Sequence, residues 1–137
     1  MAFSDEETVG QEADTTILVI DDSVALRSML GDMLDALHIE YIQASNGEEG
    51  LEKLEEAGMV DIALVDWHMP KMDGLEFVRT VTGNPKWQDL SIAMVTSENT
   101  VDRISEALEA GADDFLMKPF DREMLVAKLN VLGLHDD

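Results

Sequence analysis

Residues 62–74 read Ile62-Ala63-Leu64-Val65-Asp66-Trp67-His68-Met69-Pro70-Lys71-Met72-Asp73-Gly74, and this stretch decides the fold. Its apolar start predicts a buried strand over 62–66 that ends on a carboxylate. The carboxyl ends of parallel strands face the crevice where α/β proteins bind ligands. Because Met69-Pro70 cannot continue a strand, a shaped loop is expected before Asp73 caps the next helix. Asp66 is therefore the first candidate for chemistry.

The rest of the chain alternates short apolar runs with amphipathic stretches. Further strands are expected at residues 17–20, 39–44, 91–96 and 114–117. A helix is expected after each strand; Asn46 is a predicted cap, and Gly58 and Gly111 are predicted helix ends. The last helix is expected over 122–132. Strict β–α alternation predicts an α/β fold with a mostly parallel five-stranded sheet and helices on both faces.

Composition limits the possible classes of protein. A chain of 137 residues, 45% of them hydrophobic, can bury one ordinary core, so a single domain is expected. The absence of cysteine excludes disulfides, thiolate metal sites and cysteine nucleophiles. No apolar run approaches the ~20 residues that span a bilayer, and the N-terminus is too acidic for a signal peptide. A cytoplasmic protein without membrane contact is expected.

The formal net charge of −21 restricts the partners. A field of this sign repels phosphate backbones and anionic membranes, so nucleic-acid binding is not expected. Solvation of an acidic surface and attraction of basic partners both remain open as reasons for the charge. Residues 1–14 hold acids but no bases, which predicts a disordered tail before a domain over 15–134. No output domain is expected, because the core is predicted to end near Leu134.

Polar residues follow the expected strands at the edge where parallel strands end. They are Asp21, Asp22, Asp66, Thr96 and Lys118. Three close carboxylates repel one another unless a cation is present, and oxygen ligands without His or Cys suit Mg²⁺. An ammonium can neutralise an incoming anion from the other side, and a hydroxyl can donate to it. The set predicts a phosphoryl group placed between Mg²⁺ and Lys118, with an aspartate as covalent nucleophile.

In this order and spacing the residues resemble the receiver domain of bacterial two-component response regulators, most of all the single-domain, chemotaxis-type (CheY-like) members. The resemblance covers about residues 15–134 and rests on Asp21-Asp22, the Asp-x-x-Met-Pro-x-Met-Asp-Gly loop headed by Asp66, Thr96, and Lys118-Pro119. It implies a flavodoxin-like (βα)5 fold with strand order 2-1-3-4-5. X-Pro bonds are mostly trans, so a cis Lys118–Pro119 bond is expected from the resemblance alone.

The resemblance also assigns roles to the site residues. Asp66 would be the phosphoacceptor; Asp22, Asp66 and the backbone carbonyl of His68 would bind Mg²⁺ (or Mn²⁺), with Asp21 acting through water. Thr96 and Lys118 would contact the phosphoryl group. Thr96 and the aromatic Phe115 would form the switch, which reshapes the face made by the fourth helix, fifth strand and fifth helix. The implied donor is a sensor histidine kinase or histidine phosphotransfer protein, and the implied reader is a downstream target protein. A monomer is expected, with a weak dimer after phosphorylation as the alternative.

His68 and Glu98, each two residues after a site residue, are expected to modulate the dephosphorylation rate. A solvated His68 that contributes only its carbonyl is the alternative. Taken one at a time, the other residues also have plain interpretations: Asp21-Asp22 as an exposed helix-capping pair, Thr96 and Lys118 as ordinary surface groups, and Phe115 as core.

Two other classes of function were open to the same residues. A hydrolase or phosphotransferase with an aspartate nucleophile, as in haloacid-dehalogenase-like phosphatases, would place an acid two residues after the nucleophile, where this chain has His68. A constitutive adaptor would not need the intact acidic set with Lys118. The sequence therefore favours a signalling switch that catalyses only its own phosphorylation and dephosphorylation.

Overall fold

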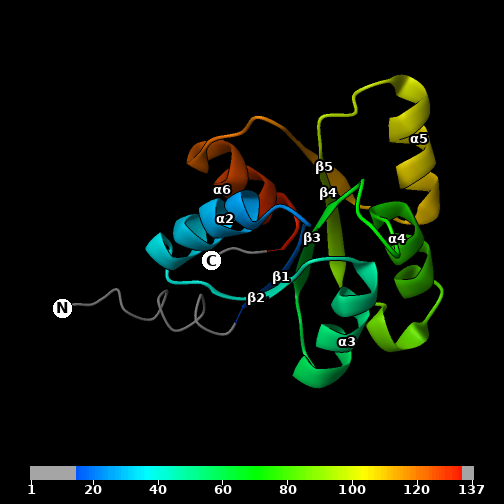
Figure 1. Ribbon diagram of the computed structural model, residues 1–137, viewed down its shortest axis with the longest axis horizontal. Coiled ribbons are helices and arrows are strands. Elements are labelled where there is room, and N and C mark those ends of the chain that lie inside the picture. Colours follow the sequence, from blue (N-terminus) through cyan, green and yellow to red (C-terminus); the bar gives the residue numbers. More distant parts are fainter. Residues whose placement is uncertain (1–14, 134–137) are drawn as a thin grey trace.

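The structure, a computed structural model, describes residues 15–133, and in them strands alternate with helices (Figure 1). The order is β1 (Thr16–Ile20), α2 (Val24–Ala36), β2 (Glu40–Ala44), α3 (Gly47–Ala57), β3 (Ile62–Asp66), α4 (Gly74–Thr82), η1 (Pro85–Trp87), β4 (Ser91–Thr96), α5 (Val101–Ala110), β5 (Asp114–Met117) and α6 (Arg122–Val131). All five predicted strands and helices are present. The predicted tail over 1–14 and the predicted core end at Leu134 lie outside the described residues.

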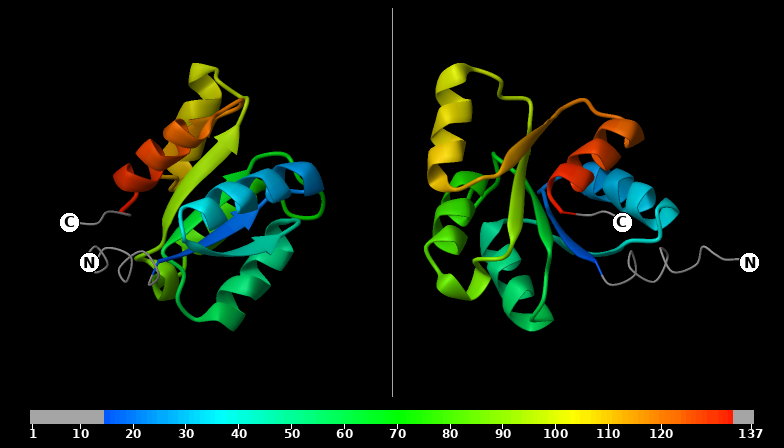
Figure 2. Two further views of the ribbon diagram at one scale, coloured as in Figure 1. Left: turned by 90° about the vertical axis from the view of Figure 1, so that its left-hand side faces the viewer. Right: turned by 180° about the vertical axis from the view of Figure 1, so that it is seen from behind.

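The five strands form one parallel sheet in the order β2-β1-β3-β4-β5, which confirms the predicted topology. Helices α2 and α6 cover one face, and α3, α4 and α5 cover the other (Figures 1 and 2). Two core clusters match these layers, because successive strand residues point to opposite faces. Leu18 and Ile20 pack on the α3–α4–α5 side, and Ile17 and Val19 pack on the α2–α6 side. All of β3 is buried, as a central strand covered on both faces should be.

Every α-helix within residues 15–133 begins with a capping side chain that accepts a backbone N–H three residues on. The caps are Ser23, Asn46, Asp73, Thr100 and Asp121. Each such cap stabilises its helix by about 1 kcal/mol. The predicted caps at Asn46 and Asp73 are confirmed. The alternative in which Asp21-Asp22 caps the first helix is wrong, because Ser23 is the cap and Asp21 is buried.

The structure departs from the sequence expectations at a few loop positions. The 3₁₀ turn η1 was not predicted. His38 and Lys71 have φ values of 62° and 68°, a region that favours glycine, although neither is glycine.

The Lys118–Pro119 bond is cis, as the resemblance implied.

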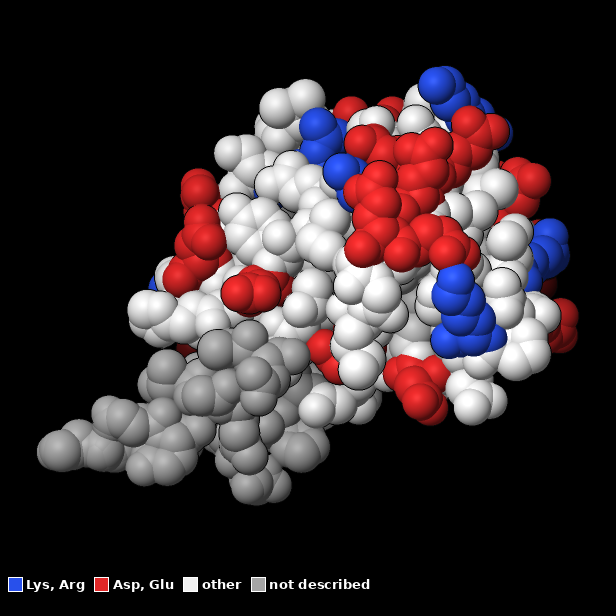
Figure 3. Space-filling model, turned by 90° about the horizontal axis from the view of Figure 1, so that it is seen from below, with Lys and Arg blue, Asp and Glu red and all other residues white. Residues whose placement is uncertain are grey.

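Charge is unevenly distributed over the surface. Acidic side chains gather on the face seen from below in Figure 3, the side on which α3 lies in Figure 1. The sequence of α3, GEEGLEKLEEA, is rich in glutamate and has Lys53 as its base. A surface of this sign repels phosphate backbones. Among residues 15–133, no helix combines the length and apolar content needed to cross a bilayer.

Candidate functional site

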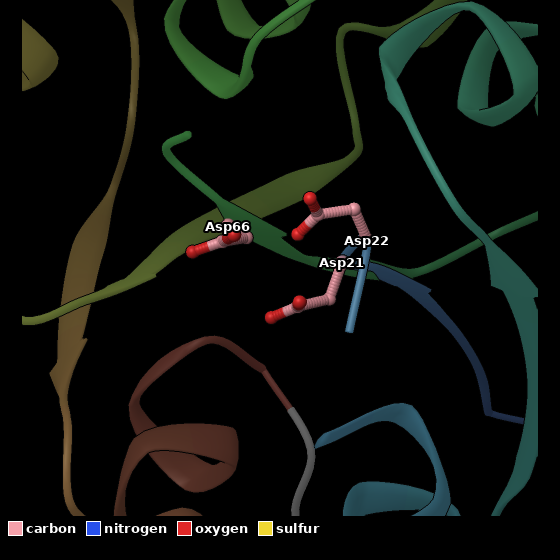
Figure 4. Close-up of side chains that lie close together, drawn as sticks. All are labelled: Asp21, Asp22 and Asp66. Atoms are coloured by element: carbon pink, nitrogen blue, oxygen red, sulfur yellow. The ribbon is translucent and has the colours of Figure 1, made fainter. Parts of the chain in front are cut away.

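Three carboxylates meet at the carboxyl ends of two neighbouring strands (Figure 4). Asp21 and Asp22 directly follow β1, and Asp66 is the last residue of β3, the strand that pairs with β1. Each offers a carboxylate oxygen, and these oxygens all lie within 4.8 Å of one another. Asp21 and Asp66 are buried, while Asp22 is exposed. The sequence prediction that these acids converge is confirmed.

The backbone around Asp21 is fixed by hydrogen bonds from two sides. Its N–H donates to the carbonyl of Ala44 at 3.1 Å, and the Arg27 guanidinium donates to its carbonyl at 2.6 Å. Its Oδ1 accepts the N–H of Ser23 at 2.8 Å, but its buried Oδ2 has no hydrogen-bond partner. A buried acceptor without a hydrogen bond costs about 1–3 kcal/mol, and the Lys118 ammonium, 3.6 Å away, offsets this only by charge, so a metal ion could still bind this oxygen. Arg27 was not anticipated, because nothing in a helical arginine signals a bond to a loop carbonyl.

The loop after Asp66 folds back tightly on the strand end. The N–H of Gly74 donates to the carbonyl of Trp67 at 2.8 Å, which closes the loop. A Cβ at position 74 would overlap the backbone carbonyl oxygen of Asp66. Glycine is thus required at this position by the close approach of α4 to the end of β3, a role the sequence interpretation had not given it.

Lys118 brings an ammonium to the carboxylates from the end of β5. Its Nζ lies 3.1 Å from Asp66 Oδ1 and 3.6 Å from Asp21 Oδ2. The backbone N–H of Lys118 donates to the carbonyl of Thr96 at 3.0 Å, which ties the ends of β4 and β5 together. The structure therefore brings the ammonium together with the acids, as the sequence predicted.

Thr96 ends β4, the strand that pairs with β3, and Phe115 lies on the next strand, β5. Thr96 is buried, and its hydroxyl accepts the backbone N–H of Glu98 at 3.0 Å. Phe115, paired with Met94 across β4 and β5, is already buried in the α3–α4–α5 core. The plain expectation that Phe115 is a core residue is therefore met in this structure.

His68 and Glu98, in the loops that follow β3 and β4, touch each other. His68 Nε2 lies 3.0 Å from Glu98 Oε2; the His68 side chain is 65% exposed and that of Glu98 is 32% exposed. Beside them, the ring of Trp67 is buried, with the Arg103 guanidinium 5.3 Å from its centroid. The His68 side chain is thus both solvent-exposed and in contact with a carboxylate, and the choice between a rate-modulating and a merely solvated His68 stays a prediction.

The electrostatics of Asp66 disfavour its ionised form. Burial, followed by the neighbouring charge of Asp21, raises the pKa of the Asp66 carboxyl, and Lys118 only partly opposes this. A divalent ion bound beside Asp66 would instead favour the ionised form of its carboxyl. The carboxylates supply hard oxygen ligands within 4.8 Å of one another, and Oδ2 of Asp21 has no hydrogen bond, so the residues fit a Mg²⁺-like ion.

A pH-dependent stability follows from the raised pKa of Asp66. In metal-free protein the unfolded chain ionises this carboxyl at lower pH than the folded chain does, so stability should fall as pH rises through the raised pKa. Asp66→Asn removes this cost. The free energy of unfolding of Asp66→Asn, measured with urea in the presence of a chelator, should exceed that of wild type only slightly near pH 4 and by about 1–3 kcal/mol near pH 7.5. An advantage that does not change with pH, or one shared by the exposed control Asp89→Asn, would contradict the assignment.

Comparison with known proteins agrees with this geometry. The family model described as "Response regulator receiver domain" matches residues 17–130. The chain is 37% identical over 119 residues to a "Chemotaxis protein CheY homolog" of Campylobacter jejuni, covering 85% of this chain and 92% of the relative. It is 34% identical over 122 residues to "Chemotaxis protein CheY1" of Helicobacter pylori, covering 88% and 98%.

Solved structures give the same result. The structure of Vibrio cholerae chemotaxis protein CheY4 superposes with a TM-score of 0.82 at 32% identity, covering 86% of this chain and 98% of that one. Family, relatives and fold thus agree over most of the chain. The chain belongs to the response regulator receiver domain family.

Proposed function

We propose that this protein is a phosphorylation-dependent switch of a two-component pathway, in which Asp66 accepts a phosphoryl group. Members of this family are signalling switches and not metabolic enzymes. The observation that carries the proposal is that an ammonium adjoins the cluster of three carboxylates: Lys118 Nζ lies 3.1 Å from Asp66. The donor would be a phosphohistidine on a sensor kinase or a histidine phosphotransfer protein.

The transfer would use Asp66 as nucleophile. One of its carboxylate oxygens attacks phosphorus, the P–N bond of the phosphohistidine breaks, and the imidazole leaves with the electron pair of that bond. Lys118 and the Thr96 hydroxyl would contact the phosphoryl oxygens, which carry the charge. Receiver domains of this family bind a divalent metal. The chain would hold Mg²⁺, or Mn²⁺, through Asp22, Asp66 and the His68 carbonyl, with Asp21 acting through water, and the ion would supply positive charge beside the phosphoryl group.

Phosphorylation would act by shifting a population between two packings. For the Thr96 hydroxyl to reach the phosphoryl group, it would leave the N–H of Glu98. Phe115, on the neighbouring strand β5, would then stay buried or become more so, and the surface made by α5, β5 and α6 would change. The signal would pass to a target protein. The named relatives are chemotaxis proteins, which supports a chemotaxis pathway.

The proposal is tested by intact mass after treatment with a small acyl phosphate and Mg²⁺. Wild type should gain one phosphoryl group per chain, and Asp66→Asn should gain none. Asp89→Asn, an exposed acid replaced in the same way, should behave like wild type. A gain in Asp66→Asn, or no gain in wild type, would refute the proposal.

His68 and Glu98 are proposed to set the lifetime of the phosphoryl group. Each follows a site residue by two positions, and their 3.0 Å contact would hinder the approach of water, so breaking it should speed hydrolysis. His68→Ala and Glu98→Ala should each raise the decay rate by about fivefold, which corresponds to roughly 1 kcal/mol of barrier. Because the two act as a unit, the double variant should decay no faster than the singles. Unchanged decay in both single variants would remove these residues from the mechanism.

A further inference from the structure

Asp22 differs from the other two acids of the site in its surroundings. Asp21 and Asp66 are buried and Asp22 is exposed, yet its carboxylate lies with theirs in one cluster (Figure 4). An exposed aspartate has several staggered rotamers open to it, so its reach into the site depends on where its backbone is held. The hydrogen bonds of that backbone therefore bear directly on the site.

Both peptide groups that flank Asp22 are held by hydrogen bonds. On its N-terminal side, Arg27 Nη1 donates to the carbonyl of Asp21 at 2.6 Å. On its C-terminal side, the N–H of Ser23 donates to Asp21 Oδ1 at 2.8 Å. Because a peptide group is planar, a bond to its oxygen also orients the Cα that follows it. Arg27 thus fixes the direction in which the chain enters Asp22.

Arg27 is itself anchored to the edge strand β2. Its Nε donates to Gln43 Oε1 at 3.2 Å, and the next residue, Ala44, accepts the N–H of Asp21 at 3.1 Å. A guanidinium is a rigid planar fork, so its two bonds hold Gln43 and the Asp21 carbonyl in a fixed relation. The turn after β1 is therefore braced against β2 by one side chain.

The start of α2 fixes Arg27 from the other direction. Its N–H donates to the carbonyl of Ser23 at 3.0 Å, and Ser23 Oγ caps the helix by accepting the N–H of Leu26 at 3.1 Å. The Arg27 side chain is half-buried, and hydrogen bonds from a charged donor are stronger than neutral ones. A bond of this kind can restrain the backbone of an exposed residue.

The charge of Arg27 has the opposite effect on a metal ion. A positive charge near the three carboxylates repels a divalent cation. Removing only that charge would strengthen metal binding, whereas losing the bond to the Asp21 carbonyl would weaken it. The sign of the change in affinity therefore separates the two roles.

We propose that Arg27 is a positioning residue for the metal site, which sets the affinity of the three carboxylates for a divalent ion by holding the carbonyl of Asp21. The inference rests on the proposed function, because it concerns the ion that assists phosphoryl transfer there. Arg27 acts through the backbone, without contact to the ion or the phosphoryl group. Removing a group that holds metal ligands in place commonly weakens metal binding about 10- to 100-fold.

Mn²⁺ binding, followed by electron paramagnetic resonance of the free ion, tests the proposal. Arg27→Met removes both side-chain hydrogen bonds and should weaken Mn²⁺ binding about tenfold or more. Arg79→Met removes a 59% exposed arginine from the last turn of α4 and is the matched control for charge. It should stay within about twofold of wild type, because salt screens distant charges. Binding by Arg27→Met as tight as by Arg79→Met, or no binding by wild type, would overturn the proposal.

Gln43→Leu tests the anchor on β2 with Arg27 and its charge in place. It should weaken Mn²⁺ binding severalfold in wild type and leave the affinity of Arg27→Met unchanged, because the two side chains act as a unit. Equal losses in the two backgrounds would show that Gln43 does not act through Arg27, and would overturn the brace.

The dependence of phosphoryl uptake on Mg²⁺ separates positioning from a general structural role. With a small acyl phosphate, Arg27→Met should need about tenfold more Mg²⁺ for the half-maximal rate of mass gain, and its maximal rate should stay within about twofold of wild type. A lowered maximal rate with an unchanged Mg²⁺ requirement would mark a different role and overturn the proposal.

Metal binding and mass gain also distinguish this inference from the proposed function. A wild type that gains one phosphoryl group, with Arg27→Met binding Mn²⁺ equally well, refutes the role of Arg27 alone. A wild type that never gains mass, but binds Mn²⁺ more tightly than Arg27→Met does, refutes the switch alone.

Discussion

Replacing Lys118 with methionine should lower the initial rate of phosphoryl transfer to Asp66 about 100-fold, the effect of removing one preorganised donor from a developing charge. The Lys118 ammonium lies 3.1 Å from Asp66 and 3.6 Å from Asp21. Without it, an incoming phosphoryl group meets three carboxylates and no side-chain cation opposite them. The rate of mass gain with a small acyl phosphate measures the effect.

The same replacement should strengthen binding of the divalent ion, because it removes a competing cation from the acids. This opposite sign separates a local effect from a folding defect, which would weaken both properties. Fluorescence of Trp67 in a Trp87→Phe background reads the metal affinity, since Trp67 directly follows Asp66. Lys86→Met, which removes an exposed partner of Glu55, is the control and should change neither property. A transfer rate within about twofold of wild type would exclude the role given to Lys118.

Gly74→Ala should destabilise the protein by about 3 kcal/mol and slow phosphoryl uptake in the fraction that folds. The new Cβ would overlap the carbonyl oxygen of Asp66 and lie 3.1 Å from the side chain of Met94. Neither can yield easily, because one is backbone and the other is buried in the core. The strand end and α4 must separate, which moves the phosphoacceptor.

Urea unfolding gives the stability change, and intact mass gives the uptake. Gly83→Ala is the matched control: its Cβ would lie 3.3 Å from the carbonyl of Arg79 at the exposed end of α4, so a loss below about 1 kcal/mol is expected. Similar losses in the two variants would show that the contact of Gly74 with Asp66 has no special cost.

The sheet and the convergence of the acids could be predicted because both follow from the alternation of strands and helices, which short sequence patterns indicate. Apolar runs such as 62–66 alternate with helical stretches, and parallel strands must bring their carboxyl ends to one edge. That rule alone placed Asp21, Asp22 and Asp66 at the same edge of the sheet. The strand order itself came from the family resemblance.

Other features depend on tertiary contacts that no local pattern carries. His38 and Lys71 occupy glycine-like backbone conformations, so the usual residue signal for a left-handed turn was missing. Arg27 reaches the carbonyl of Asp21 only because α2 packs over the end of β1. The contact of His68 with Glu98 joins two loops thirty positions apart, and only the pairing of β3 with β4 brings them together.

One hydrogen bond connects the proposed switch residue Thr96 to the two residues proposed to set the lifetime of the phosphoryl group. The Thr96 hydroxyl accepts the N–H of Glu98, and the side chain of Glu98 contacts His68. If Thr96 turns to the phosphoryl group, Glu98 loses an anchor at the moment the signal forms. The rearrangement that transmits the signal would then also loosen the Glu98–His68 contact and so promote hydrolysis of the phosphoryl group. In such a protein, the strength and the duration of signalling could not be tuned separately through Thr96.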